Sequence, residues 1–186
     1  DAYLAKAGFE AECGSFKRAR NDFFADMRTV TNLNQITTAY KRGMGVLREL
    51  PTQEPADPIR IGIVGEYFTA VDPHSNLYIE EKFIDMGVSL ARYLNITHRN
   101  LHYNEENLRR GVSEYVSYDM GPTSTMTIAA AKSYAEKGFD GIVHLKSSGC
   151  TPEIDVMPVL QRISKNIEVI TDHSLDIRRY YRKESY

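Results

Sequence analysis

The first fifty residues repeat apolar positions with the period of a helix and contain no good strand candidate. Two helices are predicted here, near residues 16–30 and 34–50. The apolar face of the first helix consists of Phe16, Phe23, Met27 and Val30. Gly43 and Gly45 fall inside the second helix, and each weakens it by about 1 kcal/mol relative to alanine. The pattern therefore predicts a helical arm over residues 1–50, whose large apolar side chains must be covered by the domain or by a second copy of the chain.

A proline-rich stretch follows the arm. Residues 51–58 contain three prolines, which exclude both a helix and a central strand. We interpret this stretch as a linker that leads into a domain over residues 59–186.

Strands and helices alternate beyond the linker. Residues 59–64 form an almost continuous apolar run, which is typical of a parallel strand that is covered on both faces. Further strands are predicted at residues 88–93, 141–146 and 167–171. The helices are predicted to begin at Ser75 or Asn76, near Asn104, at Thr123 or Ser124, and after Thr151. Together these elements predict an α/β fold with a doubly wound, mostly parallel, flavodoxin-like sheet of about four strands, for which the strand order would be 2-1-3-4.

Ligands of doubly wound sheets lie beyond the carboxyl ends of the strands, at the switch point between the first and third strands. Glu66 follows the first predicted strand, and Gly149 and Cys150 end the loop after the third. We expect both loops to line one crevice, and we take Glu66, Gly149 and Glu153 as its candidate cofactor-binding residues. Thr151 is expected to cap the next helix, with Pro152 as the first helical residue. Because a helix N-terminus favours a thiolate, Cys150 is a candidate metal ligand or nucleophile, although a buried structural cysteine is the commoner case.

The other polar candidates have structural as well as functional explanations. Glu66 can accept N–H groups of the Asp72–Asn76 loop, and Glu153 can complement the helix dipole. His144 lies inside a predicted buried strand, where a hydrogen-bonded core histidine is the favoured interpretation. His74 belongs to a turn and capping signal and can also face the crevice.

Composition and motifs exclude several functional classes. The formal net charge of the 186 residues is −2 and the pI is about 6.2, so no basic field indicates nucleic-acid binding. No apolar run approaches the length of a membrane span, and the start does not resemble a signal peptide. Neither a dinucleotide-binding nor a P-loop glycine motif is present. The two cysteines, far apart in sequence, suggest a reducing compartment, and we expect a cytoplasmic protein.

Five segments occur in an order that resembles one family. They are residues 61–67, 72–76, 79–88, 136–144 and 149–154. Together they resemble the acyl-CoA dehydratase activase-related proteins, large proteins of anaerobes with a portion similar to 2-hydroxyacyl-CoA dehydratase subunits. The resemblance runs from Ile59 to about Ile170. It implies an iron–sulfur cluster held by cysteines of several domains, with Cys150 as one metal ligand.

The resemblance also implies that this chain is one domain of a longer protein. It lacks the activator-type ATP-binding motif, so we expect no ATP hydrolysis, and it lacks the other cluster cysteines. A cluster is therefore expected in the intact protein and not in the isolated chain. The expected partners are other domains or subunits of that protein. A homo-oligomer that forms through the arm is a further option.

Three functions follow as alternatives, and none has a complete active site within this chain. The first is a component domain of a dehydratase/activase-like protein that shapes a crevice and contributes Cys150 to the cluster. The second is a cluster-free flavodoxin-like binding or assembly module. The third is a thiol enzyme with Cys150 as nucleophile, which is disfavoured because the nearest histidine, His144, lies inside a strand. The sequence does not indicate a substrate.

Overall fold

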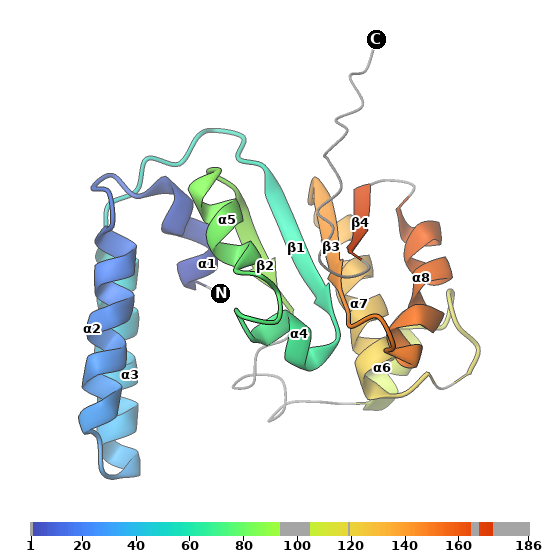
Figure 1. Ribbon diagram of the computed structural model, residues 1–186, viewed down its shortest axis with the longest axis horizontal. Coiled ribbons are helices and arrows are strands. Elements are labelled where there is room, and N and C mark those ends of the chain that lie inside the picture. The colour runs from blue at the N-terminus through green and yellow to red at the C-terminus, as the bar shows by residue number, and fades with distance from the viewer. Residues whose placement is uncertain (1, 94–104, 119, 165–167, 173–186) are drawn as a thin grey trace. The chain divides into compact units, whose positions relative to one another are not determined.

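The computed structural model describes residues 2–93, 105–118, 120–164 and 168–172 (Figure 1). The chain divides into two compact units, each described by itself. The first unit comprises Asp1–Ile61 and Ile79–Arg92, and the second comprises Gly62–Tyr78 and Tyr93–Tyr186. The strand β1 (Arg60–Gly65) contributes residues to both units. This grouping differs from the predicted division into an arm (1–50), a linker (51–58) and a domain (59–186), and that division stays a prediction.

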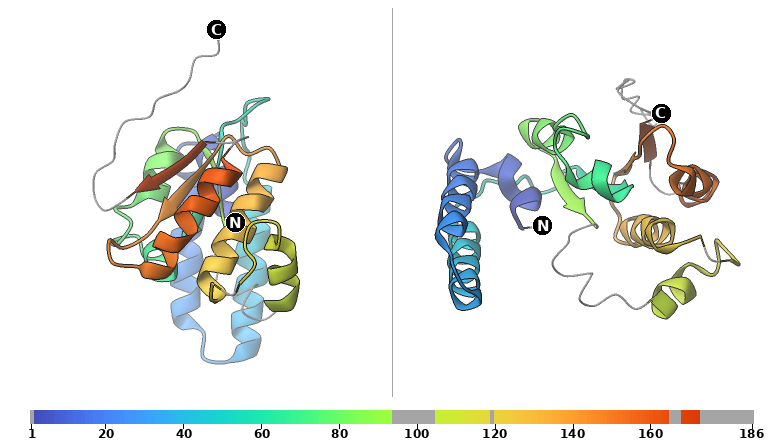
Figure 2. Two further views of the ribbon diagram at one scale, coloured as in Figure 1. Left: turned by 90° about the vertical axis from the view of Figure 1, so that its right-hand side faces the viewer. Right: turned by 60° about the horizontal axis from the view of Figure 1, so that its bottom comes forward.

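The first unit contains a helical hairpin and a smaller base. Its elements besides β1 are α1 (Ala2–Lys6), the 3₁₀ turn η1 (Ala7–Phe9), α2 (Ser15–Thr29), α3 (Leu33–Glu49), α5 (Ile79–Asp85) and β2 (Ser89–Arg92). The helices α2 and α3 lie side by side and antiparallel (Figures 1 and 2). The two helices predicted for the arm are therefore confirmed.

Side-chain caps start both hairpin helices. The carboxylate of Glu10 accepts the N–H of Gly14, the N-cap residue of α2, at 2.6 Å and the N–H of Phe16 at 2.9 Å, so it satisfies one free donor of the first turn. Asn32 caps α3 by accepting the N–H of Gln35 at 3.0 Å. The helix α3 is continuous through both of its glycines.

The base of the first unit holds its core. Ser89 of β2 donates to the carbonyl of Ala5 in α1 at 3.1 Å. The N–H of Gln53 donates to the carbonyl of Phe9 at 2.7 Å, so the proline-rich stretch is fastened to the base while it forms no helix and only an isolated bridge at Thr52. The buried apolar side chains of the base include Leu4, Phe9, Phe16, Phe83 and Val88.

The apolar face of the arm is covered only in part. Phe16 is fully buried, whereas Phe23 and Met27 are half-buried. Other large apolar side chains of the hairpin are exposed, namely Phe24, Leu33, Ile36, Tyr40 and Val46. Association of the chain through the arm stays a prediction.

The second unit is an α/β layer structure. Its elements are the rest of β1, α4 (Tyr67–Val71), α6 (Glu105–Val112), α7 (Pro122–Glu136), β3 (Gly141–Leu145), α8 (Thr151–Ile163) and β4 (Glu168–Asp172). The strands β3 and β4 pair in parallel, with Gly141 opposite Glu168. The hydrogen-bonded strand order β2-β1-β3-β4 is the predicted one, and within the second unit it places β3 between β1 and β4. The mixed α/β character is therefore confirmed.

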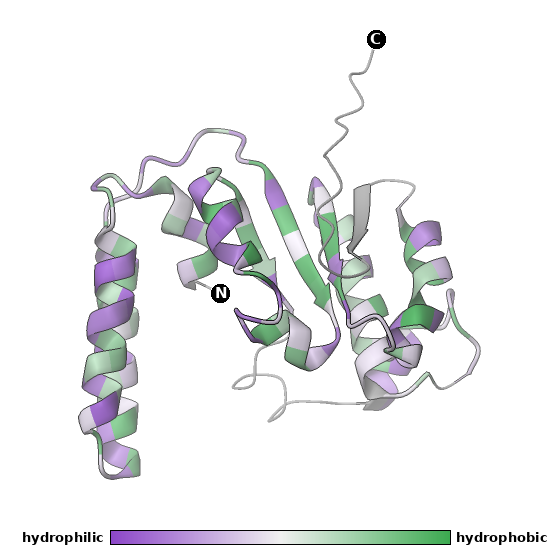
Figure 3. Cartoon of the chain, viewed as in Figure 1, coloured by the Kyte–Doolittle hydropathy of each residue, from purple (hydrophilic) through white to green (hydrophobic). Residues whose placement is uncertain are grey.

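The central strands form the core of the second unit. Figure 3 shows mostly hydrophobic positions along β1 and β3. The buried residues of these strands include Ile63, Val64, Ile142, Val143 and Leu145, and those of the neighbouring helices include Ile128, Ala131, Val156 and Leu160. The helices α7 and α8 pack against each other. Gly62 lets the ring of Tyr134 in α7 pack directly on β1, because a Cβ at this position would overlap that ring.

Four local predictions differ from the structure. The helix α5 begins at Ile79 and is not capped by Ser75 or Asn76, which lie in a turn. Cys150 rather than Thr151 is the N-cap of α8, so Pro152 is its second residue. The N-cap of α7 is Gly121, two residues before the predicted Thr123. The short helix α4 occupies a segment expected to be a loop. The predicted helix start at Asn104, the strand start at Ile167 and the chain end at residues 173–186 lie outside the described residues.

Candidate functional site

A cavity of about 650 Å³ lies in the second unit at the carboxyl ends of β1 and β3. Its lining comes from the loop after β1, the turn at residues 72–78 and the loop after β3. The lining residues are Glu66, Phe68, Thr69, His74, Ser75, Asn76, Leu77, Leu145, Lys146, Ser147 and Ser148. The two loops predicted to share a crevice do so, and His74 faces it.

Gly65 sets the position of the first loop. Its φ of +132° is accessible to glycine, and a Cβ there would overlap the carbonyl oxygen of Leu145. The next residue, Glu66, donates its N–H to that same carbonyl at 2.8 Å. The missing side chain thus lets β1 approach β3 closely where the cavity begins.

The carboxylate of Glu66 caps α4. It accepts the N–H groups of Phe68 and Thr69 at 3.0 Å each, and the Thr69 hydroxyl also donates to it. Burial raises the pKa of Glu66, but the hydrogen bonds from the Thr69 side chain and from the backbone of Thr69 and Phe68 outweigh burial and hold the pKa below its usual value. Glu66 therefore lines the cavity as an ionised helix cap. Its N–H partners come from α4 and not from the Asp72–Asn76 loop.

The turn at residues 72–78 contributes residues 74–77 to the lining. Asp72 accepts the N–H of Ser75 at 2.7 Å, and the hydroxyl of Tyr78 lies 2.9 Å from Nδ1 of His74. Leu77 and Tyr78 both have left-handed backbones, with φ of 57° and 58°. Such conformations cost free energy in non-glycine residues, so the surrounding contacts hold this turn in a defined shape.

Lys146 is a lining residue that the sequence interpretation treated as part of a buried strand. It directly follows β3, and its exposed fraction is 4%. Its Nζ donates to the carbonyl of Ser147 at 3.5 Å, at the long limit for a hydrogen bond. A lysine directly after a buried strand, where a surface residue would be expected to end the burial, is the sequence signal that could have found it.

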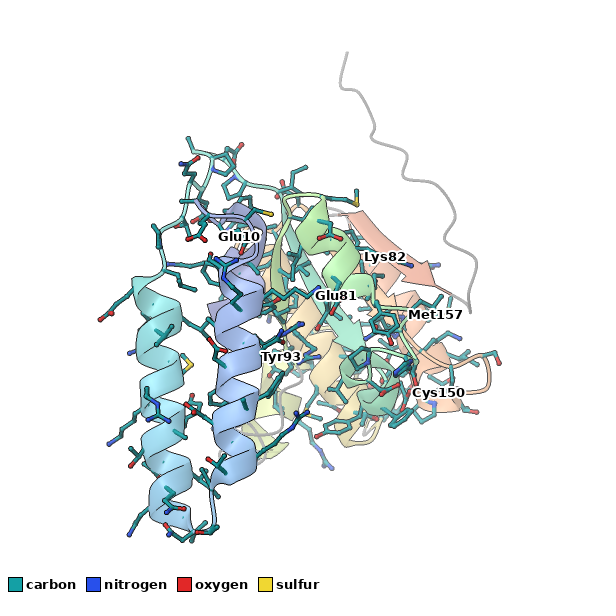
Figure 4. The ribbon with its side chains drawn as sticks, turned by 60° about the vertical axis from the view of Figure 1, so that its left-hand side comes forward. Glu10, Glu81, Lys82, Tyr93, Cys150 and Met157 are labelled. Atoms are coloured by element: carbon teal, nitrogen blue, oxygen red, sulfur yellow. The ribbon has the colours of Figure 1, made fainter. Side chains whose placement is uncertain are left out.

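Cys150 follows the lining residue Ser148 by two positions and is not in the lining itself. It is the N-cap residue of α8, is half-buried and is unpaired, and it is labelled in Figure 4. Gly149 is exposed, and a Cβ added to it would meet no atom within 4 Å. The predicted place of Cys150, after a strand end and at the first helical turn, is confirmed. Cys13 is exposed and is also unpaired.

Glu153 lies in the interior of the second unit. Both it and His144 have an exposed fraction of 0%, and the Glu153 carboxylate lies 2.7 Å from Nε2 of His144. The hydroxyl of Thr127 in α7 donates to the same carboxylate at 3.3 Å. The expected buried, hydrogen-bonded role of His144 agrees with this geometry. Glu153, chosen as a crevice residue, belongs to this cluster and not to the cavity lining.

The part of the chain that the structure describes has no group of three or more histidine, cysteine, aspartate or glutamate side chains that could hold a metal ion. An iron–sulfur cluster takes about four protein ligands. The described residues alone therefore do not fit such a cluster, and Cys150 could serve only together with ligands from elsewhere.

The chain matches no protein-family model, no curated protein and no solved structure. The resemblance to the dehydratase activase-related proteins therefore depends on the sequence segments alone. Within the described ranges, no helix combines the length and apolar character needed to cross a membrane.

Proposed function

We propose that the second unit is a small-molecule binding module of flavodoxin-like architecture and that its ligand occupies the cavity at the carboxyl ends of β1 and β3. The supporting observation is the cavity itself, which is lined by the loops after both strands. Its volume of about 650 Å³ is typical of small-molecule sites. In doubly wound sheets the preferred place for a ligand is this switch point between neighbouring strands.

The flavodoxin-like assignment is supported by three features. Within the second unit β3 lies between β1 and β4, the β3–β4 pairing is parallel, and helices alternate with strands along the chain. On this proposal the module works in the cytoplasm as part of a larger protein, and other domains or subunits are its partners.

Amide chemical-shift mapping of the whole chain against a small-molecule library tests the binding function. Ligands are expected to shift amides of all three lining segments, such as those of Thr69, Ser75 and Ser147. Ser148→Trp should abolish these shifts because it fills the cavity. Gln161→Trp, at an exposed position of α8, is the matched control. A library without a single hit on the three segments would contradict the proposal.

A second candidate is a component domain of a dehydratase/activase-like protein that contributes Cys150 to a shared iron–sulfur cluster. The observation that favours it is an unpaired, half-buried thiol at the N-cap of α8, two residues after the lining residue Ser148. Anaerobic reconstitution of the full-length protein with iron and sulfide tests it by charge-transfer absorbance. Cys150→Ser should weaken this absorbance and Cys13→Ser should not. Equal absorbance in both variants would exclude Cys150 as a ligand.

A further inference from the structure

We propose that the occupant of the cavity carries an anionic carboxylate or phosphate group and that Lys146 is the residue that binds it. This inference deepens the proposed binding function and depends on it. It assigns a charge to the ligand and a position for that charge, at the carboxyl end of β3.

Few interactions with other residues compensate for the burial of the Lys146 ammonium group. The exposed fraction of Lys146 is 4%, and its ammonium group carries three donors. Within the described ranges, its hydrogen bonding consists of the 3.5 Å contact with the carbonyl of Ser147, and no carboxylate forms an ion pair with it. Because a buried charge is costly unless it is paired, the cavity offers a place where a ligand anion would stabilise this side chain.

Glu66 supplies a carboxylate to the lining of the same cavity, but this carboxylate does not pair with the ammonium group of Lys146. Both of its oxygens accept N–H groups of the first turn of α4, and, among the residues that the structure describes, no ion pair joins Glu66 to Lys146. Asp72 precedes the lining residues of the turn, is not itself in the lining, and accepts the N–H of Ser75. Glu66, the acidic residue of the described lining, is thus occupied by the backbone, which leaves the lysine for the ligand.

The remaining lining fits a ligand with an anionic end and an apolar body. The hydroxyl groups of Thr69, Ser75, Ser147 and Ser148 line the cavity as neutral hydrogen-bonding groups, with His74 as a further titratable group. Phe68, Leu77 and Leu145 supply apolar surface. Charge-assisted hydrogen bonds are stronger than neutral ones, so the ammonium group of Lys146 is expected to dominate recognition of the anion.

Titration of the whole chain with three related probes tests the inference. Benzoate and phenyl phosphate carry the two candidate anionic groups on one apolar ring, while benzamide has nearly the shape of benzoate and no charge. Amide shifts at Ser147 and Thr69 are measured up to tens of millimolar. We expect at least one of the two anions to bind. If benzoate binds, benzamide should bind at least tenfold more weakly than benzoate. The comparison of the two anions shows which group the site prefers.

Variants then test the lysine. Lys146→Met, which keeps the chain length and removes the charge, should weaken anion binding at least tenfold, and Lys146→Arg should retain more of it. Lys82→Met is the matched control, because Lys82 is an exposed residue of α5 outside the cavity lining (Figure 4). If Lys146→Met does not fold, the contrast between benzoate and benzamide in the unmodified chain and the effect of Lys146→Arg still decide the question.

The outcomes separate this inference from the proposed function. Equal binding of benzamide and benzoate, or anion binding unchanged in Lys146→Met, would overturn the role of the charge while the cavity remains a binding site. If neither anion shifts the lining amides but neutral library compounds do, the inference also fails and the binding function stands. If nothing shifts them, both fail.

Discussion

Nε2 of His144 lies 2.7 Å from the carboxylate of Glu153, and both side chains are completely buried. This contact joins β3 to the first turn of α8, and the hydroxyl of Thr127 adds α7 to the same cluster. Nδ1 of His144 is buried without a hydrogen-bond partner among the described residues. The cluster therefore fixes the start of α8, and with it Cys150 and the loop that lines the cavity.

Removing Glu153 should destabilise the second unit. Glu153→Ala leaves His144 and Thr127 without their partner in the interior, which is expected to cost about 3 kcal/mol of the free energy of unfolding in urea. Glu153→Gln keeps a hydrogen-bonding side chain of the same size and should cost less. Asp155→Ala, at an exposed position of the same helix, is the control. Equal losses for Glu153→Ala and Asp155→Ala would show that the buried cluster contributes nothing.

Gly65→Ala should disrupt the junction of β1 and β3. The added methyl group would overlap the carbonyl of Leu145, and the φ of +132° is strained for alanine. We expect a loss of about 3 kcal/mol or more in stability, together with shifts of amides around the cavity. Gly149→Ala, in an exposed loop with free space around it, should leave stability nearly unchanged. A Gly65→Ala variant as stable as Gly149→Ala would contradict the close approach of the two strands at Gly65.

Helices and strands with a regular hydrophobic pattern could be predicted from the sequence. The strand order was predicted from the connection rules for alternating strands and helices, not from a local pattern. The two arm helices, the strands themselves and the linker follow from helical periodicity, from buried apolar runs and from the proline-rich stretch at residues 51–58. These signals are local, because each element carries its own repeat or its own chain breaker. The same local signals placed Glu66 and the loop after β3 at one crevice.

Structural features that depend on contacts between residues far apart in the sequence could not be predicted from it. The helix α4 has five residues, too few to show a periodic pattern, and its cap is a glutamate rather than one of the common capping residues. The burial of Lys146 and Glu153 depends on neighbouring segments, since each charged residue alone would be expected at the surface. The cap of α8 lies one residue before the predicted one, a difference that is common at helix ends.

The lowered pKa of Glu66 predicts acid sensitivity. A carboxyl group whose pKa is lower in the folded state contributes stability that is complete above its unfolded pKa of about 4.3 and is lost as the pH falls through the folded pKa. Glu66→Gln should therefore be less stable than the unmodified chain at neutral pH, by about 1 kcal/mol or less. This difference should shrink below pH of about 4. Urea unfolding from neutral pH to about pH 3 measures it, and a difference that grows on acidification would have the wrong sign.

The two glycines of α3 should respond oppositely to alanine. A Cβ at Gly45 meets no atom within 4 Å, so Gly45→Ala should stabilise the hairpin by about 0.5–1 kcal/mol through helix propensity. A Cβ at Gly43 would overlap the ring of Phe23, so Gly43→Ala must displace that ring and should lose the propensity gain or destabilise the hairpin by about 1–3 kcal/mol. Each glycine thus serves as the control for the other. Thermal unfolding followed by helical circular dichroism, together with hydrogen exchange of hairpin amides, measures the difference. Equal stabilisation by both substitutions would show that Phe23 does not pack on Gly43 and that the antiparallel contact of α2 with α3 is looser than the structure places it.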